Sequence, residues 1–237
     1  HAQRKCSRGD RPPSGALGKR VGRAPAVQEV FSMIRQLAPS SAPVLIGGPS
    51  GSGKELVARE IHNCSSRRNG PFVAINAAAL PESLIESELF GHEKGAFTGA
   101  TDRHAGCFEQ AHGGTLFLDE PGEMPRSAQP ILLRVLETLR LRRLGGRNEL
   151  SVDVHLLAAT SQPTETHLRD DIFYRLGVFQ ILLPPLRERA EEIPLLAQAM
   201  IQSLNQKNGT LVTGIDSEVL DVFKAYEWPG NARELRN

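Results

Sequence analysis

The sequence has little cysteine, few aromatic residues and no long apolar run. Its three cysteines, Cys6, Cys64 and Cys107, form no CxxC pair, so a disulfide framework and a zinc site of the usual spacing are both excluded. No stretch approaches the ~18 consecutive apolar residues of a membrane span. The polar, basic lead-in has no apolar segment behind it, as a secretory signal would require. These absences predict a cytoplasmic protein with no membrane partner.

Neither positive nor negative charge is in clear excess. Lys and Arg number 28 against 27 Asp and Glu, a net charge of +1. Bulk charge therefore points neither towards nucleic acid nor away from it. With 40% hydrophobic and 23% charged residues, the composition is that of an ordinary globular domain.

Short apolar runs alternate with helical patterns until two prolines, Pro184 and Pro185. This alternation predicts an α/β core with a mostly parallel sheet sandwiched by helices. Beyond the prolines only helical signals remain, and Asn231 is expected to cap the last helix. We therefore expect a linker or disordered segment at 1–17, an α/β core at 18–185 and a small helical lid at 186–237. Expected strands are 44–46, 72–75, 115–118, 152–159 and 178–183, and expected helices are 27–37, 54–63, 131–139, 191–204 and 216–226, with a further helix after Pro81.

A glycine-rich turn between the first expected strand and the next helix has the spacing G-x-x-x-x-G-K. Glycines let several N–H groups face one anion, the helix start adds positive dipole, and the lysine reaches terminal phosphates. Such a turn alone is often only a turn, but strand, lysine and helix in register favour a nucleotide. The predicted nucleotide-binding residues here are Gly48, Ser50, Gly51, Ser52, Gly53, Lys54 and Glu55, the last replacing the usual Ser or Thr.

Two adjacent acids, Asp119 and Glu120, end the apolar strand at 115–118. A carboxylate at the carboxyl end of a parallel strand is well placed to hold magnesium. Glu120 could polarise the water that attacks a γ-phosphate. The alternative is an acidic loop facing solvent. Together with the lysine turn, the pair predicts ATP and Mg²⁺ as cofactors.

The segment after Pro81 carries a more specific signal, ELFGHEKGAFTGA at 88–100. It resembles the signature of the bacterial enhancer-binding proteins, the NtrC-like AAA+ activators of sigma-54 RNA polymerase, and the resemblance runs from about Gly18 to Asn237. It implies an ATP-hydrolysing motor that remodels sigma-54 RNA polymerase and opens promoters. In that family the loop touches sigma-54, which assigns Gly95, Ala96, Phe97, Thr98, Gly99 and Ala100 to the partner contact. The alternative is a loop whose Phe97 tucks into its own core.

The same resemblance assigns further roles. Asn76 is similar to a switch residue that holds the catalytic glutamate, and Thr160 to a first sensor. Arg169 and Arg175 fall where the family places arginines that act across a subunit interface, which implies a homo-oligomer, a hexameric ring. Arg233 resembles a second sensor that reaches nucleotide. The alternatives are surface salt bridges for the arginines and a turn former for Asn76.

Four departures from the family pattern stand out. Pro49 replaces a glutamate and so removes an amide, Pro121 is expected to push Glu120 towards extended geometry, and Ser161 replaces an asparagine. The segment between Thr160 and Arg169 is about five residues shorter and lacks the Gly-x-Phe of the family pattern. These departures leave open a nucleotide-binding regulatory module with impaired ATPase activity.

Two further expectations concern partners. An ATPase with another client, as in clamp loaders or chelatases, is disfavoured by the loop at 95–100. Family members usually carry a helix-turn-helix domain after this region, so DNA binding is expected only through a domain absent from this chain.

Overall fold

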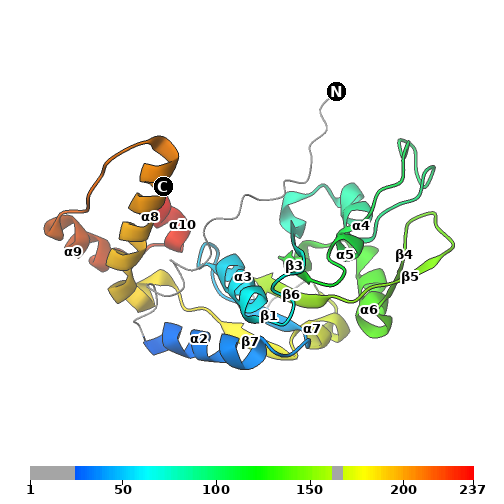
Figure 1. The fold of residues 1–237 in the computed structure, drawn as a ribbon, viewed down its shortest axis with the longest axis horizontal. Helices are drawn as coiled ribbons and strands as arrows, with labels where there is room; N and C mark the ends of the chain where they lie inside the picture. The colour runs from blue at the N-terminus through cyan, green and yellow to red at the C-terminus, as the bar shows by residue number, and fades with distance from the viewer. Residues whose placement is uncertain (1–24, 162–167) are drawn as a thin grey trace.

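A computed structural model describes residues 25–161 and 168–237 of the chain (Figure 1). The linker expected at 1–17 and most of the short stretch ahead of Arg169 lie outside these ranges. Within them, no helix combines the length and apolar character needed to cross a membrane.

The core is a five-stranded sheet in which every neighbouring pair is parallel, as the alternating pattern predicts. Its order is β2-β3-β6-β1-β7. The central strands are the most deeply buried, because helices cover both faces. The strands are β1 (Val44–Gly47), β2 (Phe72–Asn76), β3 (Thr115–Asp119), β6 (His155–Thr160) and β7 (Phe179–Leu182).

Two apolar cores occupy the two faces of the sheet. Leu89, Phe90 and Leu116 belong to the larger one, and Ile46 and Ile61 to the other. Since neighbouring side chains of a strand point to opposite faces, Leu116 and Phe117 of β3 enter different cores. The helices of this part are α2 (Pro25–Leu37), α3 (Lys54–Cys64), α4 (Glu82–Phe90), α5 (Cys107–Gln110), α6 (Ala128–Thr138) and α7 (Asp170–Leu176), with short 3₁₀ turns η1 (Ala77–Ala79) and η2 (Pro121–Glu123).

A small antiparallel hairpin, β4 (Arg140–Arg142) with β5 (Glu149–Ser151), projects away from the main sheet (Figure 1). The sequence did not predict it, because three-residue strands are too short to show an alternating pattern. The seven-residue helix α7 was also not predicted.

The C-terminal part is helical and lies at the opposite end of the molecule from the hairpin (Figure 1). It consists of η3 (Leu186–Glu192), α8 (Ile193–Asn208), α9 (Ser217–Ala225) and α10 (Asn231–Arg236). Leu186, Ile193, Leu196 and Trp228 form its own small core. We refer to residues 186–237 as the lid.

The expectation that Asn231 caps the last helix is wrong. Asn231 is the first residue of α10, with a φ of 53°, and Gly230 precedes it without a side-chain cap. The Glu234 carboxylate accepts a hydrogen bond from Gly230 N at 2.8 Å instead. The Asn231 side chain is thereby left for longer-range contacts, since its amide donates to Ser50 O at 2.9 Å and its oxygen accepts from Leu186 N at 2.8 Å.

Candidate functional site

The lysine turn connects β1 to α3 and folds tightly around three glycines. Gly48, Gly51 and Gly53 have φ angles of 145°, 76° and 104°, a region that residues with a Cβ rarely adopt. At Gly51 a Cβ would also lie 2.4 Å from Gly230 O of the lid. Glycine is therefore required there both by backbone geometry and by the close approach of the lid.

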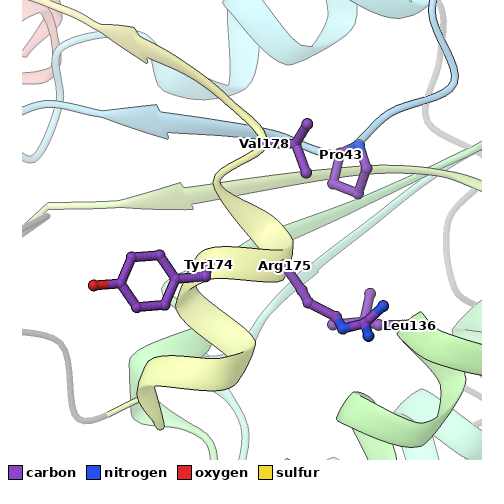
Figure 2. Close-up of a pocket in the computed structure, with 5 residues that line it drawn as sticks. All are labelled: Pro43, Leu136, Tyr174, Arg175 and Val178. Carbon is purple, nitrogen blue, oxygen red and sulfur yellow. The ribbon is translucent and has the colours of Figure 1, made fainter.

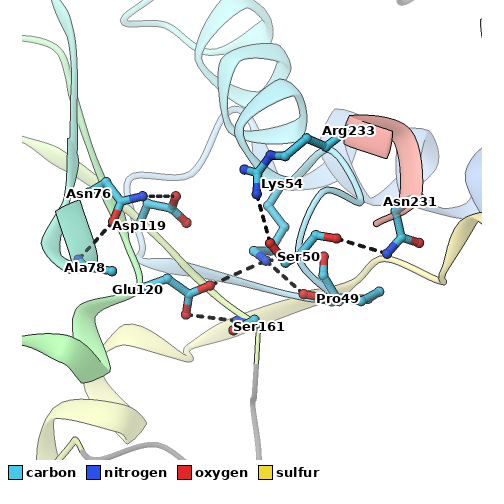
Figure 3. Close-up of polar contacts among 11 residues, drawn as sticks. Pro49, Ser50, Lys54, Asn76, Ala78, Asp119, Glu120, Ser161, Asn231 and Arg233 are labelled. Carbon is cyan, nitrogen blue, oxygen red and sulfur yellow. Dashed lines mark hydrogen bonds and ion pairs between the residues drawn. The ribbon is translucent and has the colours of Figure 1, made fainter. Parts of the chain in front are cut away.

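Lys54 begins α3 and is buried, with its ammonium turned back into the turn. Its Nζ donates to Gly48 O at 2.9 Å and lies 3.7 Å from Glu120 Oε1 (Figure 3). Glu55, next along the chain, is half exposed and binds Arg59 of the same helix at 2.8 Å.

The turn offers hydrogen-bond donors that the protein itself does not use. In the described chain no backbone carbonyl accepts from the amides of Gly51, Gly53 or Lys54. The Ser52 hydroxyl is buried, and no partner for it lies among the residues that the structure describes. Unsatisfied buried donors are costly, and an anion seated in the turn would satisfy them. The chemistry of the turn thus fits a phosphate group.

The acid pair lies across the end of the sheet from this turn (Figure 3). Glu120 does not adopt the extended geometry expected before Pro121. Its φ and ψ are 53° and 57°, in the left-handed region. Its amide continues the sheet by donating to Ala159 O at 2.8 Å, while its carboxylate accepts from Ser161 N at 3.0 Å. These two bonds hold the left-handed turn and aim the carboxylate at Lys54.

Asp119 is partnered by Asn76 on the neighbouring strand. The two residues are register partners of β3 and β2, and Asn76 Nδ2 donates to Asp119 Oδ2 at 3.1 Å. The family resemblance implies that Asn76 holds the catalytic glutamate. In this structure the strand register brings the Asn76 side chain to Asp119 instead, and the two form a hydrogen bond. Burial raises the pKa of Asp119, with a smaller contribution from Glu120, while Lys54 and Arg233 act in the opposite direction.

Two of the remaining predicted residues approach the turn from other elements. Thr160 is buried at the end of β6, and its carbonyl accepts from Gly48 N at 3.2 Å. Arg233 of α10 donates to the Ser50 hydroxyl at 3.1 Å. The turn, the acid pair, Thr160 and Arg233 therefore gather at one edge of the sheet.

The two arginines around α7 do not join this group. Arg169 binds Asp171 at 2.7 Å, and Arg175 binds Glu137 at 3.0 Å, both on the surface. Arg175 also lines a shallow hollow of about 230 Å³ between α6 and α7, beside the exposed Tyr174 (Figure 2). Within one chain these arginines are paired with their own carboxylates and face outwards.

The predicted partner loop is a compact turn between α4 and α5. Gly95 N donates to Ala100 O at 2.8 Å and closes it. The Phe97 side chain is 43% exposed, and its ring meets His92 edge-on at 4.9 Å. It does not enter the core, so the alternative of a buried Phe97 is not what the structure has. Thr98 and Gly99 are exposed.

Sequence reasoning missed two lid residues that contact the lysine turn. Arg189 is buried beside Glu192, and its Nη2 donates to Ser52 O at 2.6 Å. Asn231 reaches Ser50 O, as described above. Both contacts join residues more than a hundred positions apart, so no local pattern could reveal them. In the sequence Arg189 stands within the charged run 187–192, so nothing there signals that its side chain is buried.

Two family models match the chain. The sigma-54 interaction domain matches residues 20–182, and the AAA+ ATPase lid domain matches residues 187–237.

Curated relatives are similar over nearly the whole chain. The DNA-binding transcriptional regulator NtrC of Azospirillum brasilense is 53% identical over 222 residues, 92% of this chain and 46% of the relative. The regulatory protein AtoC of Escherichia coli is 48% identical over 219 residues, 90% of this chain and 48% of the relative. The chain thus spans about half the length of these proteins.

Solved structures agree with the fold. NtrX from Brucella abortus in complex with ADP is 40% identical with a TM-score of 0.83, covering 92% of this chain and 48% of that one. The same protein in complex with ATP gives the same values. Hsp104, at 17% identity and a TM-score of 0.66, shares the fold alone over 92% of this chain and 44% of its own.

Proposed function

The chain belongs to the NtrC-like family of sigma-54 activators, an AAA+ family, and from this we propose that it is an ATP-hydrolysing motor that remodels sigma-54 RNA polymerase. One observation carries the proposal. The buried Lys54 ammonium lies between the lysine turn, with its unused hydrogen-bond donors, and the Glu120 carboxylate, and its Nζ is 3.7 Å from Glu120 Oε1. A terminal phosphate in the turn would meet a cation, a metal-binding acid and a base at the same edge of the sheet.

The nucleotide would bind between the core and the lid. The unused amides of Gly51, Gly53 and Lys54 and the Ser52 hydroxyl would face its phosphates, and Arg233 would reach them from the lid. Asp119 is the residue that would hold Mg²⁺, which neutralises charge on the phosphate oxygens. The ADP and ATP complexes of NtrX support a nucleotide as the ligand of this chain.

Glu120 would act as the general base for the attacking water. Its carboxylate is oriented by Ser161 N at 3.0 Å and is only partly exposed. Two residues would sense the loss of the γ-phosphate: Asn76, which is hydrogen-bonded to Asp119 at 3.1 Å, and Thr160, which lies beside the turn. Asn76 connects directly to η1 and then to α4, which carries the Gly95–Ala100 loop.

Arg169 and Arg175 would complete the site of a neighbouring protomer in a hexameric ring. Both lie on the surface in pairs with exposed or half-exposed carboxylates, which are weak enough to exchange for a phosphate. Phe97 and Thr98, exposed at the loop, would contact sigma-54.

A steady-state ATPase assay over a range of protein concentrations tests the motor. Because the arginines must come from a neighbour, turnover per protomer should rise with concentration and then level off. Turnover that is independent of concentration would contradict a site shared between subunits.

The second candidate function, a nucleotide-binding regulatory module, is favoured by one observation. Pro49 has no N–H, so the turn offers one donor fewer to a phosphate. Tight ATP binding without turnover at any concentration would support that module and reject the motor.

A further inference from the structure

Three consecutive carbonyls of the lysine turn accept hydrogen bonds from the lid. Ser50 O accepts from Asn231 Nδ2 at 2.9 Å, Gly51 O from Ala232 N at 3.1 Å, and Ser52 O from Arg189 Nη2 at 2.6 Å. Asn231 and Arg189 are both buried, at 2% and 7% exposure. The lid therefore binds the backbone of the turn itself.

Because the peptide bond is planar, these contacts also fix the direction of the N–H group that follows each carbonyl. In a trans peptide the C=O and the following N–H point in opposite directions. A carbonyl of Ser50 directed at the lid fixes the amide of Gly51 on the opposite side, and a carbonyl of Ser52 fixes the amide of Gly53. These two amides have no backbone acceptor within the described chain. Without these contacts the peptide groups around the two glycines would be free to reorient, because glycine lacks a Cβ and accepts both positive and negative φ.

We propose that Asn231 and Arg189 are positioning residues for the phosphate site: they hold the Ser50 and Ser52 carbonyls towards the lid so that the Gly51 and Gly53 amides face the anion. This inference rests on the proposed nucleotide site. It assigns to the lid a second role, separate from the reach of Arg233 to the ligand.

The coupling runs in both directions. If lid contacts set the amides, then an anion that binds those amides strengthens the lid contacts by the same free energy. Asn231 is the central residue, because its oxygen also accepts from Leu186 N, at the start of the lid. One side chain thus links the turn, the lid entrance and α10.

The first test removes the Asn231 side chain. Asn231→Gly is the suitable variant, because glycine accepts the φ of 53° without strain. Asn205→Ala is the matched control, since Asn205 also donates to a backbone carbonyl, Val212 O at 2.7 Å, and accepts from Val212 N at 3.1 Å, but remote from the turn. Affinity for Mg-ATP and amide hydrogen exchange of residues 50–54 without nucleotide are measured for both.

Asn231→Gly should weaken ATP binding about tenfold, the factor expected for one hydrogen bond of ordinary net strength. It should also speed exchange at 50–54 while α8 stays protected, whereas Asn205→Ala should change neither. Unchanged ATP affinity, or weaker binding with unchanged exchange at 50–54, overturns the proposal. Exchange that rises equally throughout the lid also overturns it, because Asn231 would then only stabilise the lid fold.

A second measurement needs no variant. Inorganic triphosphate with Mg²⁺ has no adenine, so its effect on the lid must pass through the turn or through Arg233. It should slow exchange at the Leu186 and Ala232 amides of the natural chain. The Leu186 amide separates the two routes, because it donates to Asn231 and not to Arg233, and no change at Leu186 overturns the coupling. If the chain binds triphosphate in this way yet hydrolyses no ATP, the motor fails and the positioning role stands.

Discussion

Replacing Glu120 with Gln separates nucleotide binding from turnover. The amide keeps an oxygen that can accept from Ser161 N, now at 3.0 Å from the carboxylate, so the left-handed turn should persist. What is lost is the charge and the ability to take a proton from water. General bases contribute about 10²- to 10⁴-fold to rate, so turnover should fall by at least about a hundredfold.

ATP affinity should be retained or increased by the same change. Glu120 Oε1 lies 3.7 Å from Lys54 Nζ and competes with phosphate for it. At an effective dielectric constant of about 20 the gross attraction at this separation is about 4 kcal/mol. Desolvation offsets most of it. A net gain of about 1 kcal/mol would tighten ATP binding about fivefold.

The assay pairs ATP titration with steady-state hydrolysis in saturating Mg-ATP. Glu123→Gln serves as the control, because Glu123 is exposed on η2 only three residues away and makes the same change in charge. Hydrolysis by Glu120→Gln within about threefold of the natural chain would refute the role of general base. Loss of ATP binding would refute the competition for Lys54.

Two further changes test other parts of the site. Asp119→Asn should raise the melting temperature of the nucleotide-free protein at pH 7, because the raised pKa of Asp119 means that its charge opposes folding above that pKa. Asp119 contributes most to stability below the ordinary aspartate pKa of about 3.9 and loses that contribution as pH rises. In thermal unfolding scans the advantage of the variant should therefore shrink as the pH is lowered towards 4. A lower melting temperature of the variant at pH 7 contradicts this. Phe97→Ala should shift the melting temperature by less than about 2 °C and leave ATPase unchanged, yet weaken sigma-54 binding at least about tenfold in a pull-down titration. Leu84→Ala, at 42% exposure against 43% for Phe97, is its control, and equal losses from both would refute a specific contact.

The sheet and the lysine turn were readable from the sequence because their signals are local. Apolar runs such as Val44–Gly47 and Thr115–Asp119 are short and bounded by turn residues, and both form strands. The parallel arrangement follows from the helices between them. Elements without a clear period, such as α7 and the β4–β5 hairpin, escaped prediction.

The fine geometry of the site was less accessible. A proline at 121 predicts an extended Glu120, but two hydrogen bonds outweigh that local preference: the Glu120 amide donates to Ala159 O of β6, and the Glu120 carboxylate accepts from Ser161 N. Asn231 reads as a helix cap, yet its partners lie at Ser50 and Leu186. Sequence gives residue types that suit a role, whereas these partners depend on the packing of segments far apart in the chain.

The β4–β5 hairpin has a mechanical consequence for the loop at 95–100. A Cβ at Gly145, in the hairpin turn, would lie 2.9 Å from Ala96 Cβ, and Glu93 N donates to Leu144 O at 3.0 Å. The turn of the hairpin is therefore in contact with the start of the loop. A force applied at Phe97 is shared between α4, which leads into the loop, and α6, which leads into the hairpin. The loop and the hairpin together therefore resist bending better than either would alone.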